Sequence, residues 1–253
     1  MFGLIKNKDR IAIGVSGGKD SLLMWYALDI YCKKLKDELN WDVEIKAFHV
    51  NINYVKNTDY SKINEFAKKH NLLIEYIDSD IGEILKRTTN KGKVQCSLCS
   101  KMKKAVLIEK AKQQNYRKLA MAHHADDAIE TLWLNLLNEG RISTFKPITF
   151  LDRSDVYLIR PLILAREKEI IKESKKLKLP IIQNACPNEH STQRAEIKEF
   201  IEKNFYKSSK WKNSYINMLS ALYNGENSYL WFYNEEDKFE NLMNKVNENK
   251  EIV

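Results

Sequence analysis

Residues 11–23 read IAIGVSGGKDSLL, a short apolar run that passes through a glycine-rich turn into an amphipathic segment. The run from Ile11 to Val15 predicts a strand, and the stretch from Lys19 to about Leu39 predicts a helix. Glycines allow a tight turn close to an anion, and a helix start offers amide donors and the positive end of its dipole. The spacing fits neither a Walker A loop nor a dinucleotide fingerprint. We predict phosphate binding by Gly14, Val15, Ser16, Gly17, Gly18, Lys19, Asp20 and Ser21.

The rest of the first 180 residues alternates short β-branched runs with longer amphipathic stretches. Such alternation predicts an α/β fold with a parallel, five-stranded, Rossmann-like sheet and helices on both faces. Backbone near Val50, at the end of the second strand, is expected to contact adenine. Further strands are expected at 43–50, 72–77, 118–122 and 156–159, and further helices at 61–70, from Cys96 to about 115, at 126–138 and at 166–176.

Two segments are expected along the chain. Residues 1–180 form the nucleotide-binding domain, with an insertion at about 79–103 that carries a C-x-x-C pair. Residues 181–253 form a loop with another cysteine and a small helical C-terminal extension. The aromatic residues of that extension, Trp211 and Tyr215 among them, suit core or dimer contacts, and an RNA-stacking surface is the alternative.

The overall composition favours a folded cytoplasmic protein. Only 43% of the 253 residues are hydrophobic, and no apolar run approaches the roughly 20 residues of a membrane helix. The start of the chain has no apolar segment typical of a secretory signal. The net charge of +8 suits an RNA partner, but a lysine-rich solvated surface would give the same value.

A second motif, AHHADD, spans Ala122 to Asp127 at the end of a predicted strand. Its two carboxylates could cap the following helix or hold Mg²⁺ together with phosphate oxygens. Because the carboxyl ends of parallel strands share one edge of the sheet, Asp127 is expected near the phosphate loop. His123 and His124 either orient this loop or contact the ligand directly.

The cysteines suggest a metal centre. Cys96 and Cys99 form a C-x-x-C pair, and Cys186 is the natural third ligand if the chain folds back. Three thiolates can hold an iron–sulfur cluster with one iron open. Zinc held by Cys96, Cys99, Cys186 and His190 is the competing site, and thiols acting by persulfide are a third option. Cys32, inside the first helix, is expected in the core.

The loop SGGKDS resembles the signature of the pyrophosphate-loop (PP-loop) ATPases of the HUP class, which adenylate an oxygen and release pyrophosphate. The ordered series SGGKDS, CSLCSKMKK, HHADDAIETLWLNLL and IRPLILAREKEI, followed by Cys186, is similar to the tRNA 2-thiocytidine synthetase (TtcA-like) family. This resemblance covers almost the whole chain. Two departures concern the target nucleotide: Ala122 replaces the family's usual glycine, and Cys186 lacks its usual cysteine–glycine surroundings.

The resemblance implies a tRNA sulfurtransferase that thiolates the anticodon-loop cytidine at position 32. ATP, Mg²⁺ and a [4Fe-4S] cluster on Cys96, Cys99 and Cys186 are implied, with Ala122 and Asp127 at the nucleotide. Lys103, Asp127, Cys99 and Cys186 are the catalytic candidates. The implied partners are tRNA and a sulfur donor, either a cysteine desulfurase or free sulfide, and a homodimer is one option.

Alternatives on the same loop are a 2-thiouridine synthase, a lysidine-type synthetase and a non-catalytic, zinc-containing nucleotide- and RNA-binding protein. The three cysteines argue against an amine-transferring synthetase, which needs no cluster. A zinc cytidine deaminase is excluded, because the chain lacks an H-x-E before Cys96 and a Pro-Cys-x-x-Cys.

Overall fold

The computed structural model describes residues 2–53, 58–88, 96–182 and 192–223. Within the chain, Met1–Tyr215 and Ile216–Val253 form separate compact units. No helix in the described ranges is long and apolar enough to cross a membrane.

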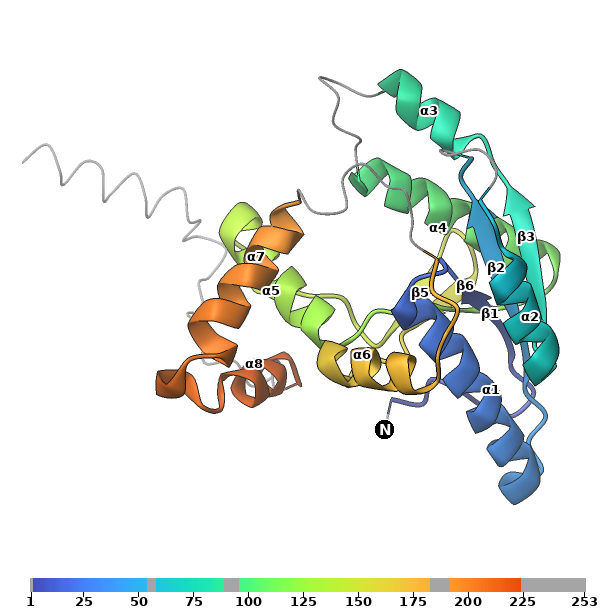
Figure 1. Cartoon of the computed structure of the whole chain (residues 1–253), viewed down its shortest axis with the longest axis horizontal. Coiled ribbons are helices and arrows are strands. Elements are labelled where there is room, and N and C mark those ends of the chain that lie inside the picture. The colour runs from blue at the N-terminus through green and yellow to red at the C-terminus, as the bar shows by residue number, and fades with distance from the viewer. Residues whose placement is uncertain (1, 54–57, 89–95, 183–191, 224–253) are drawn as a thin grey trace, which may run out of the picture. The chain divides into compact units, whose positions relative to one another are not determined.

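The first unit is built on one sheet, ordered β3-β2-β1-β4-β6-β5 (Figure 1). Its strands are β1 (Arg10–Gly14), β2 (Glu44–Asn51), β3 (Ile74–Asp78), β4 (Lys118–Ala120), β5 (Ile148–Leu151) and β6 (Val156–Ile159). The five expected parallel strands are confirmed, since β1, β2, β3, β4 and β6 all pair in parallel. The sequence prediction missed β5, which pairs antiparallel to β6 and adds a sixth strand at that edge.

The helices before and after these strands also follow the expected alternation. They are α1 (Lys19–Leu39), α2 (Ser61–His70), α3 (Ile81–Thr88), α4 (Cys96–Gln113), α5 (Ala125–Glu139) and α6 (Glu167–Lys176). After α6 come α7 (Gln193–Ile201), the short π-helix η1 (Glu202–Tyr206), the short 3-10 helix η2 (Ser209–Trp211), and α8 (Ser214–Tyr223). The predicted bounds of α1 and α2 are confirmed, and α3 was not predicted.

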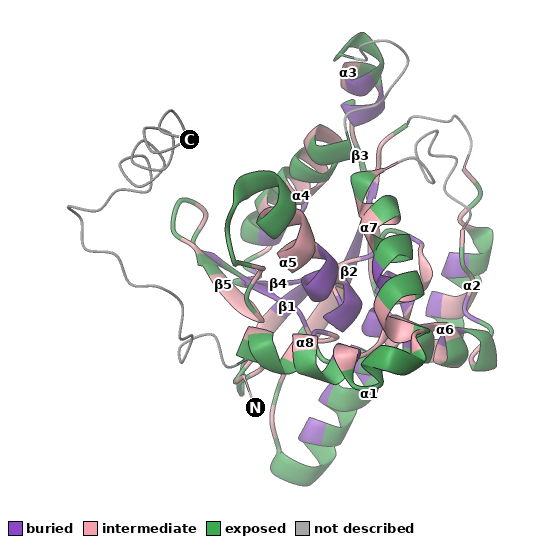
Figure 2. Ribbon diagram, turned by 90° about the vertical axis from the view of Figure 1, so that its left-hand side faces the viewer, coloured by how far each residue is buried: buried purple, intermediate pink, exposed green. Residues whose placement is uncertain are grey.

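Alternation along β1 divides the core into two layers. Ile11 and Ile13 are fully buried on one face, in a cluster with Trp25 of α1 and Ile63 of α2. Ala12, between them, joins a second cluster that includes residues of α3 and α4. Helices therefore cover both faces of the sheet, and Figure 2 shows the central strands in the buried colour.

The strand order sets the position of the site. The chain leaves β1 toward β2 on one side, and β4 lies on the other side of β1. In open parallel sheets, ligands bind beyond the carboxyl ends of the strands where the order reverses in this way. The loop after β1 and the motif after β4 lie at this point.

Candidate active site

The turn from β1 into α1 is held by its own hydroxyl groups. The Ser16 backbone N–H donates to Ser21 Oγ over 3.0 Å, and the two serine Oγ atoms are 3.1 Å apart. Ser21 Oγ also lies 3.0 Å from the Gly18 carbonyl, to which it donates. Gly17 has φ of +86°, a conformation that side chains with a Cβ rarely adopt. The predicted phosphate loop is therefore a preformed turn at a helix N-terminus.

The outer side of this loop contacts the segment after α6. The Ile182 N–H donates to the Gly17 carbonyl over 3.0 Å, and a Cβ on Gly17 would lie 3.4 Å from Ile182 Cβ. Ile182 is the last residue that the structure describes in the segment after α6. The phosphate loop is thus tied by its backbone to a segment more than 160 residues further along the chain.

Helix α4 approaches the end of β1 from the other face of the sheet. A Cβ on Gly14 would lie 3.1 Å from Leu107 Cδ1, so this position needs glycine for the close approach of α4. Three turns of α4 N-terminal to Leu107 carry Cys96, Cys99 and Lys103. The spacings of three and four residues put these side chains on the same helix face as Leu107.

His49 connects Lys103 with the loop electrostatically. Its Nδ1 lies 2.8 Å from the Val15 carbonyl, and its ring is buried. Burial lowers the pKa of His49, and the positive charge of Lys103 adds to this effect. Lys103 is therefore close enough to His49 of β2 to disfavour protonation of this ring.

The second motif follows β4 and forms the start of α5, where His124 and Asp127 each bond the backbone N–H of the other. The His124 N–H donates to Asp127 Oδ2 over 3.0 Å, and the Asp127 N–H donates to His124 Nδ1 over 3.3 Å. Two roles were expected for His124, and these contacts fit the first of them, in which the residue orients the loop. The ring of His123 lies against Phe145, with 4.9 Å between ring centroids. Burial lowers the pKa of His123 to about 4, so this imidazole is neutral at physiological pH.

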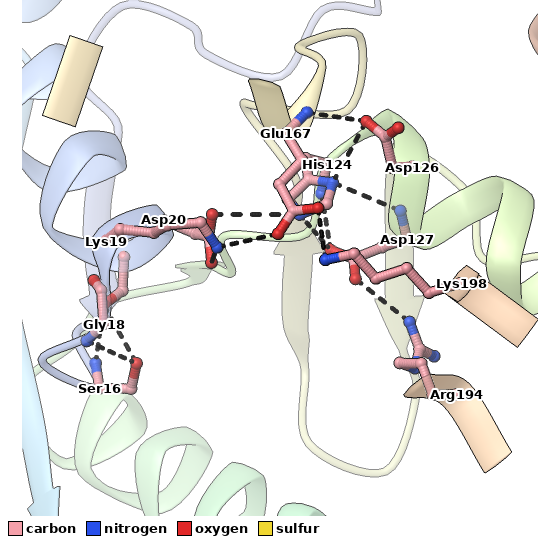
Figure 3. Close-up of polar contacts among 11 residues, drawn as sticks. Ser16, Gly18, Lys19, Asp20, His124, Asp126, Asp127, Glu167, Arg194 and Lys198 are labelled. Atoms are coloured by element: carbon pink, nitrogen blue, oxygen red, sulfur yellow. Dashed lines mark hydrogen bonds and ion pairs between the residues drawn. The ribbon is translucent and has the colours of Figure 1, made fainter. Parts of the chain in front are cut away.

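Ion pairs join the phosphate loop to α6 and α7 (Figure 3). Lys19 Nζ lies 3.2 Å from Asp20 Oδ2 and 3.1 Å from Glu167 Oε1, and Lys198 Nζ lies 2.5 Å from Glu167 Oε2. Although burial alone would lower the pKa of Lys19, the carboxylates of Asp20 and Glu167 raise it. These contacts hold the lysine charged above the helix start.

The side chain of Arg194, on α7, extends to the acidic N-terminal turns of α5. Its Nη1 lies 3.2 Å from Asp127 Oδ1 and 3.4 Å from Glu130 Oε2, and its Nη2 donates to Thr131 Oγ1 over 3.0 Å. Glu130 is 5% exposed. Burial raises the pKa of Glu130 to about 7, and the neighbouring Asp127 contributes to the increase.

A cavity of about 530 Å³ opens between these side chains. Three cations and six carboxylates face it, so its formal charge is negative before any ligand binds. The lining residues are Lys19, Asp20, His124, Asp127, Glu130, Glu167, Thr192, Arg194, Ala195, Lys198, Glu199 and Glu202.

The acidic groups of this cavity suit a hard divalent cation. Asp20 Oδ1 is buried and accepts no hydrogen bond from any residue that the structure describes, and Nε2 of His124 is 4.0 Å away. Carboxylate oxygens combined with phosphate oxygens are the ligands that Mg²⁺ prefers. Asp20 and Asp127 therefore have the chemistry to hold Mg²⁺ beside a bound triphosphate.

The predicted metal ligands are only partly described. Cys96 is exposed and Cys99 is half-buried on the first turn of α4, where spacing i, i+3 lets both thiols face one ligand. Cys186 and His190 lie outside the described residues. Cys32 is buried in α1 as expected, and burial raises the pKa of its thiol to about 11.

The remaining predicted residues lie at the same edge of the sheet. Val50 is buried near the carboxyl end of β2, and Ala122 follows β4 and packs against the first core cluster. Sequence reasoning missed Glu167, Arg194 and Lys198. The four-residue spacing of Arg194 and Lys198 on α7, which places both on one helix face, was the available signal.

A doubly covered parallel sheet, with a glycine-serine loop after β1 opposite an acidic helix start after β4, defines a nucleotide-binding protein of the PP-loop class. Agreement with the family model described as the PP-loop domain extends over residues 2–205. Among curated relatives, the tRNA-cytidine(32) 2-sulfurtransferase of Citrifermentans bemidjiense is 32% identical over 203 residues, covering 79% of this chain and 78% of that protein. The chain belongs to the tRNA 2-thiocytidine synthetase (TtcA-like) family of PP-loop ATPases.

Other relatives are longer. The tRNA-cytidine(32) 2-sulfurtransferase of Idiomarina loihiensis is 34% identical over 203 residues, which cover 79% of this chain but 65% of that protein. The corresponding protein of Ralstonia pickettii is 30% identical, and 62% of it is covered. The chain thus spans under two thirds of the length of these relatives.

A solved structure shares the fold. The U34-tRNA thiolase NcsA from Methanococcus maripaludis, solved with its [4Fe-4S] cluster, matches with a TM-score of 0.67 and 23% identity. The match covers 89% of this chain and 75% of that one.

Proposed function

We propose that this chain is an ATP-dependent tRNA thiolase that replaces the C2 oxygen of cytidine 32, in the anticodon loop, with sulfur. The observation that carries the proposal is the meeting of the SGGKDS loop with Asp127 at one edge of the sheet, in a chain of this family. The names of the relatives supply the target nucleotide.

The first step is adenylation. The C2 oxygen attacks the α-phosphorus of ATP, and pyrophosphate leaves. The amides of the loop, the Ser16 and Ser21 hydroxyls and Lys19 would hold the phosphates, because these groups lie at the start of α1. Residues Gly14 to Ser21, Val50 and Ala122 would line the nucleotide.

The second step is substitution. A sulfide attacks C2, and AMP leaves with the original oxygen and its electron pair, so no net oxidation takes place. Lys103 would oppose the negative charge that develops at C2, because preorganised positive charge at such a position is commonly a large catalytic contribution. Asp127 would hold Mg²⁺ at the phosphates.

The excess of carboxylates in the cavity supports a role for Mg²⁺. A triphosphate cannot enter a negatively charged site without added positive charge. A bound Mg²⁺ would supply it, and Lys19 and Arg194, which now pair with carboxylates, would then be available to the phosphates.

Cys96, Cys99 and Cys186 would hold a [4Fe-4S] cluster. The two described thiols share one face of α4 with Lys103, so a ligand on them would lie on the side of the helix that faces the end of β1. When bound, the cluster supplies the sulfur nucleophile through its open iron. Zinc on the three cysteines and His190 is the alternative, and it would require an external sulfur carrier.

Residues 1–180 would act as the nucleotide-binding domain and 181–253 as an extension that brings the third cysteine and contacts tRNA. We place the protein in the cytoplasm, where tRNA, ATP and a cysteine desulfurase or free sulfide are available. A homodimer is compatible with this assignment.

The direct test compares the thionucleosides in tRNA from cells with and without the gene. Loss of 2-thiocytidine supports the proposal, whereas loss of a 2-thiouridine or of lysidine assigns another acceptor. Calorimetry with ATP tests the loop: Ser16→Ala and Asp20→Ala should each weaken binding with the fold intact. Wild-type affinity in both variants would move the nucleotide away from this loop.

A further inference from the structure

The chain that follows α7 has a composition unlike the rest of the protein. From Lys203 to Tyr215 it reads KNFYKSSKWKNSY, with four lysines, four aromatic residues and no acidic residue. Such alternation of lysines and aromatic rings is the composition of a surface that binds single-stranded nucleic acid.

Four aromatic rings, each from a different element, form a continuous cluster, which we call the aromatic ledge: Trp133, Phe200, Phe205 and Trp211. Trp133 of α5 lies 5.9 Å from Phe200 of α7 and 5.5 Å from Phe205 of η1, between ring centroids. Phe205 in turn lies 6.4 Å from Trp211 of η2. Each ring of the ledge therefore lies against at least one other ring.

The outer members of the ledge are open to solvent. Trp211 is 50% exposed and Phe200 is 45% exposed, while Trp133 and Phe205 are half-buried beneath them. Exposed aromatic rings of this kind are surfaces on which unpaired bases can stack. Figure 2 shows α7 exposed or intermediate over most of its length.

Four lysines accompany these rings along the chain. Lys203, Lys207, Lys210 and Lys212 are all exposed, and Lys210 Nζ lies 5.6 Å from the centre of the Trp211 ring. Lys207 pairs with Glu202, 3.3 Å away. Within the described ranges, no ion pair involves Lys203 or Lys212, so their charge is available to phosphates.

Helix α7 links the ledge to the candidate active site. One side of α7 carries Arg194 and Lys198 into the cavity, and Phe200 lies on the side that packs against Trp133. The same helix therefore borders both the phosphate-binding cavity and the aromatic ledge.

We propose that the aromatic ledge and its lysines form a docking surface for the unpaired nucleotides of an RNA loop. Bases would stack on Trp211 and Phe200, and Lys203, Lys210 and Lys212 would contact phosphates. A second copy of this chain fits less well, because a twofold interface through this surface would bring like charges together. The inference rests on the proposed function, which supplies an RNA loop as substrate.

The test uses the full chain and fluorescently labelled tRNA, with the dissociation constant measured by anisotropy at several salt concentrations. Trp211→Ala should weaken binding about 5- to 150-fold, the range for loss of one stacked base, while Trp211→Phe should keep most of the affinity. Lys210→Gln and Lys212→Gln together should weaken binding and reduce the slope of log affinity against log salt by about 1 to 2. Lys34→Gln, an exposed lysine on α1, is the matched control and should change neither quantity.

Affinity for ATP, measured in the same variants, separates the outcomes. It should stay at the wild-type value in each variant, because none of the mutated residues lines the cavity. If wild-type protein binds tRNA but Trp211→Ala and the double lysine variant bind equally well, the ledge is not the RNA surface and the proposed function stands. If those variants instead lose self-association, the surface joins two copies, and the inference is wrong. Failure of wild-type protein to bind tRNA overturns both proposals.

Discussion

The substitution Glu130→Gln should stabilise the protein at high pH and leave its stability unchanged at low pH. Burial raises the pKa of Glu130 to about 7 from the ordinary value of 4.5. The folded state therefore keeps the proton that the unfolded chain releases, and the stability of the wild-type protein falls as the pH rises from about 4.5 to 7. This difference in pKa corresponds to about 3 kcal/mol.

Glutamine resembles the protonated acid in shape and does not ionise, so the variant escapes this loss. Urea unfolding at pH 5 and pH 8, in EDTA to remove divalent cations, should show a gain of about 2–3 kcal/mol at pH 8 and little at pH 5. Glu199→Gln, an exposed carboxylate of the same cavity, is the control and should show no such pH dependence. An equal effect of Glu130→Gln at both pH values would refute the account of the buried carboxyl.

Three further predictions concern the loop, the cation and the cysteines. Gly17→Ala should lower the free energy of unfolding by about 1–3 kcal/mol, because Gly17 has φ of +86°. Gly18→Ala, whose Cβ would meet only Ser16 Oγ at 3.5 Å, should lower it little; urea unfolding measures both. Asp127→Asn should abolish pyrophosphate release with nearly unchanged melting temperature, since an amide can still cap α5 but binds Mg²⁺ weakly. If activity and melting temperature fall together, the role of Asp127 is only to cap α5. In protein purified without oxygen, Cys99→Ala should remove iron and visible absorbance while Cys32→Ala should not, and colourless wild-type protein with stoichiometric zinc would contradict the cluster.

Most of the sheet could be predicted because buried parallel strands are continuous apolar runs between amphipathic helices. Strand β5 was missed because it is a short edge strand, with Phe150 42% exposed, and such strands lack the clear apolar pattern. Helix α3 was missed because its eight residues lie in the predicted insertion before the C-x-x-C pair. Both elements depend on tertiary contacts that a local pattern does not contain.

The parts of the candidate site that lie within a single sequence motif could be predicted. The SGGKDS loop and the acidic start of α5 are local, and the rule for parallel sheets brings them together. The partners of these motifs were not predictable, because Arg194 reaches Asp127 across 67 residues and Glu167 reaches Lys19 across almost the whole domain. Local sequence carries no information about such pairs beyond the spacing of charges on α7.

The hydrogen bond between Ile182 and Gly17 gives the protein a mechanical linkage. Ile182, the last residue described after α6, is held by this bond at the outer side of the phosphate loop. If the loop moves when phosphates bind, the backbone of Ile182 must move with Gly17. If the loop does not move, Ile182 keeps its position. Any movement of the phosphate loop would therefore be transmitted through the backbone to Ile182, so the segment after α6 and the loop respond together.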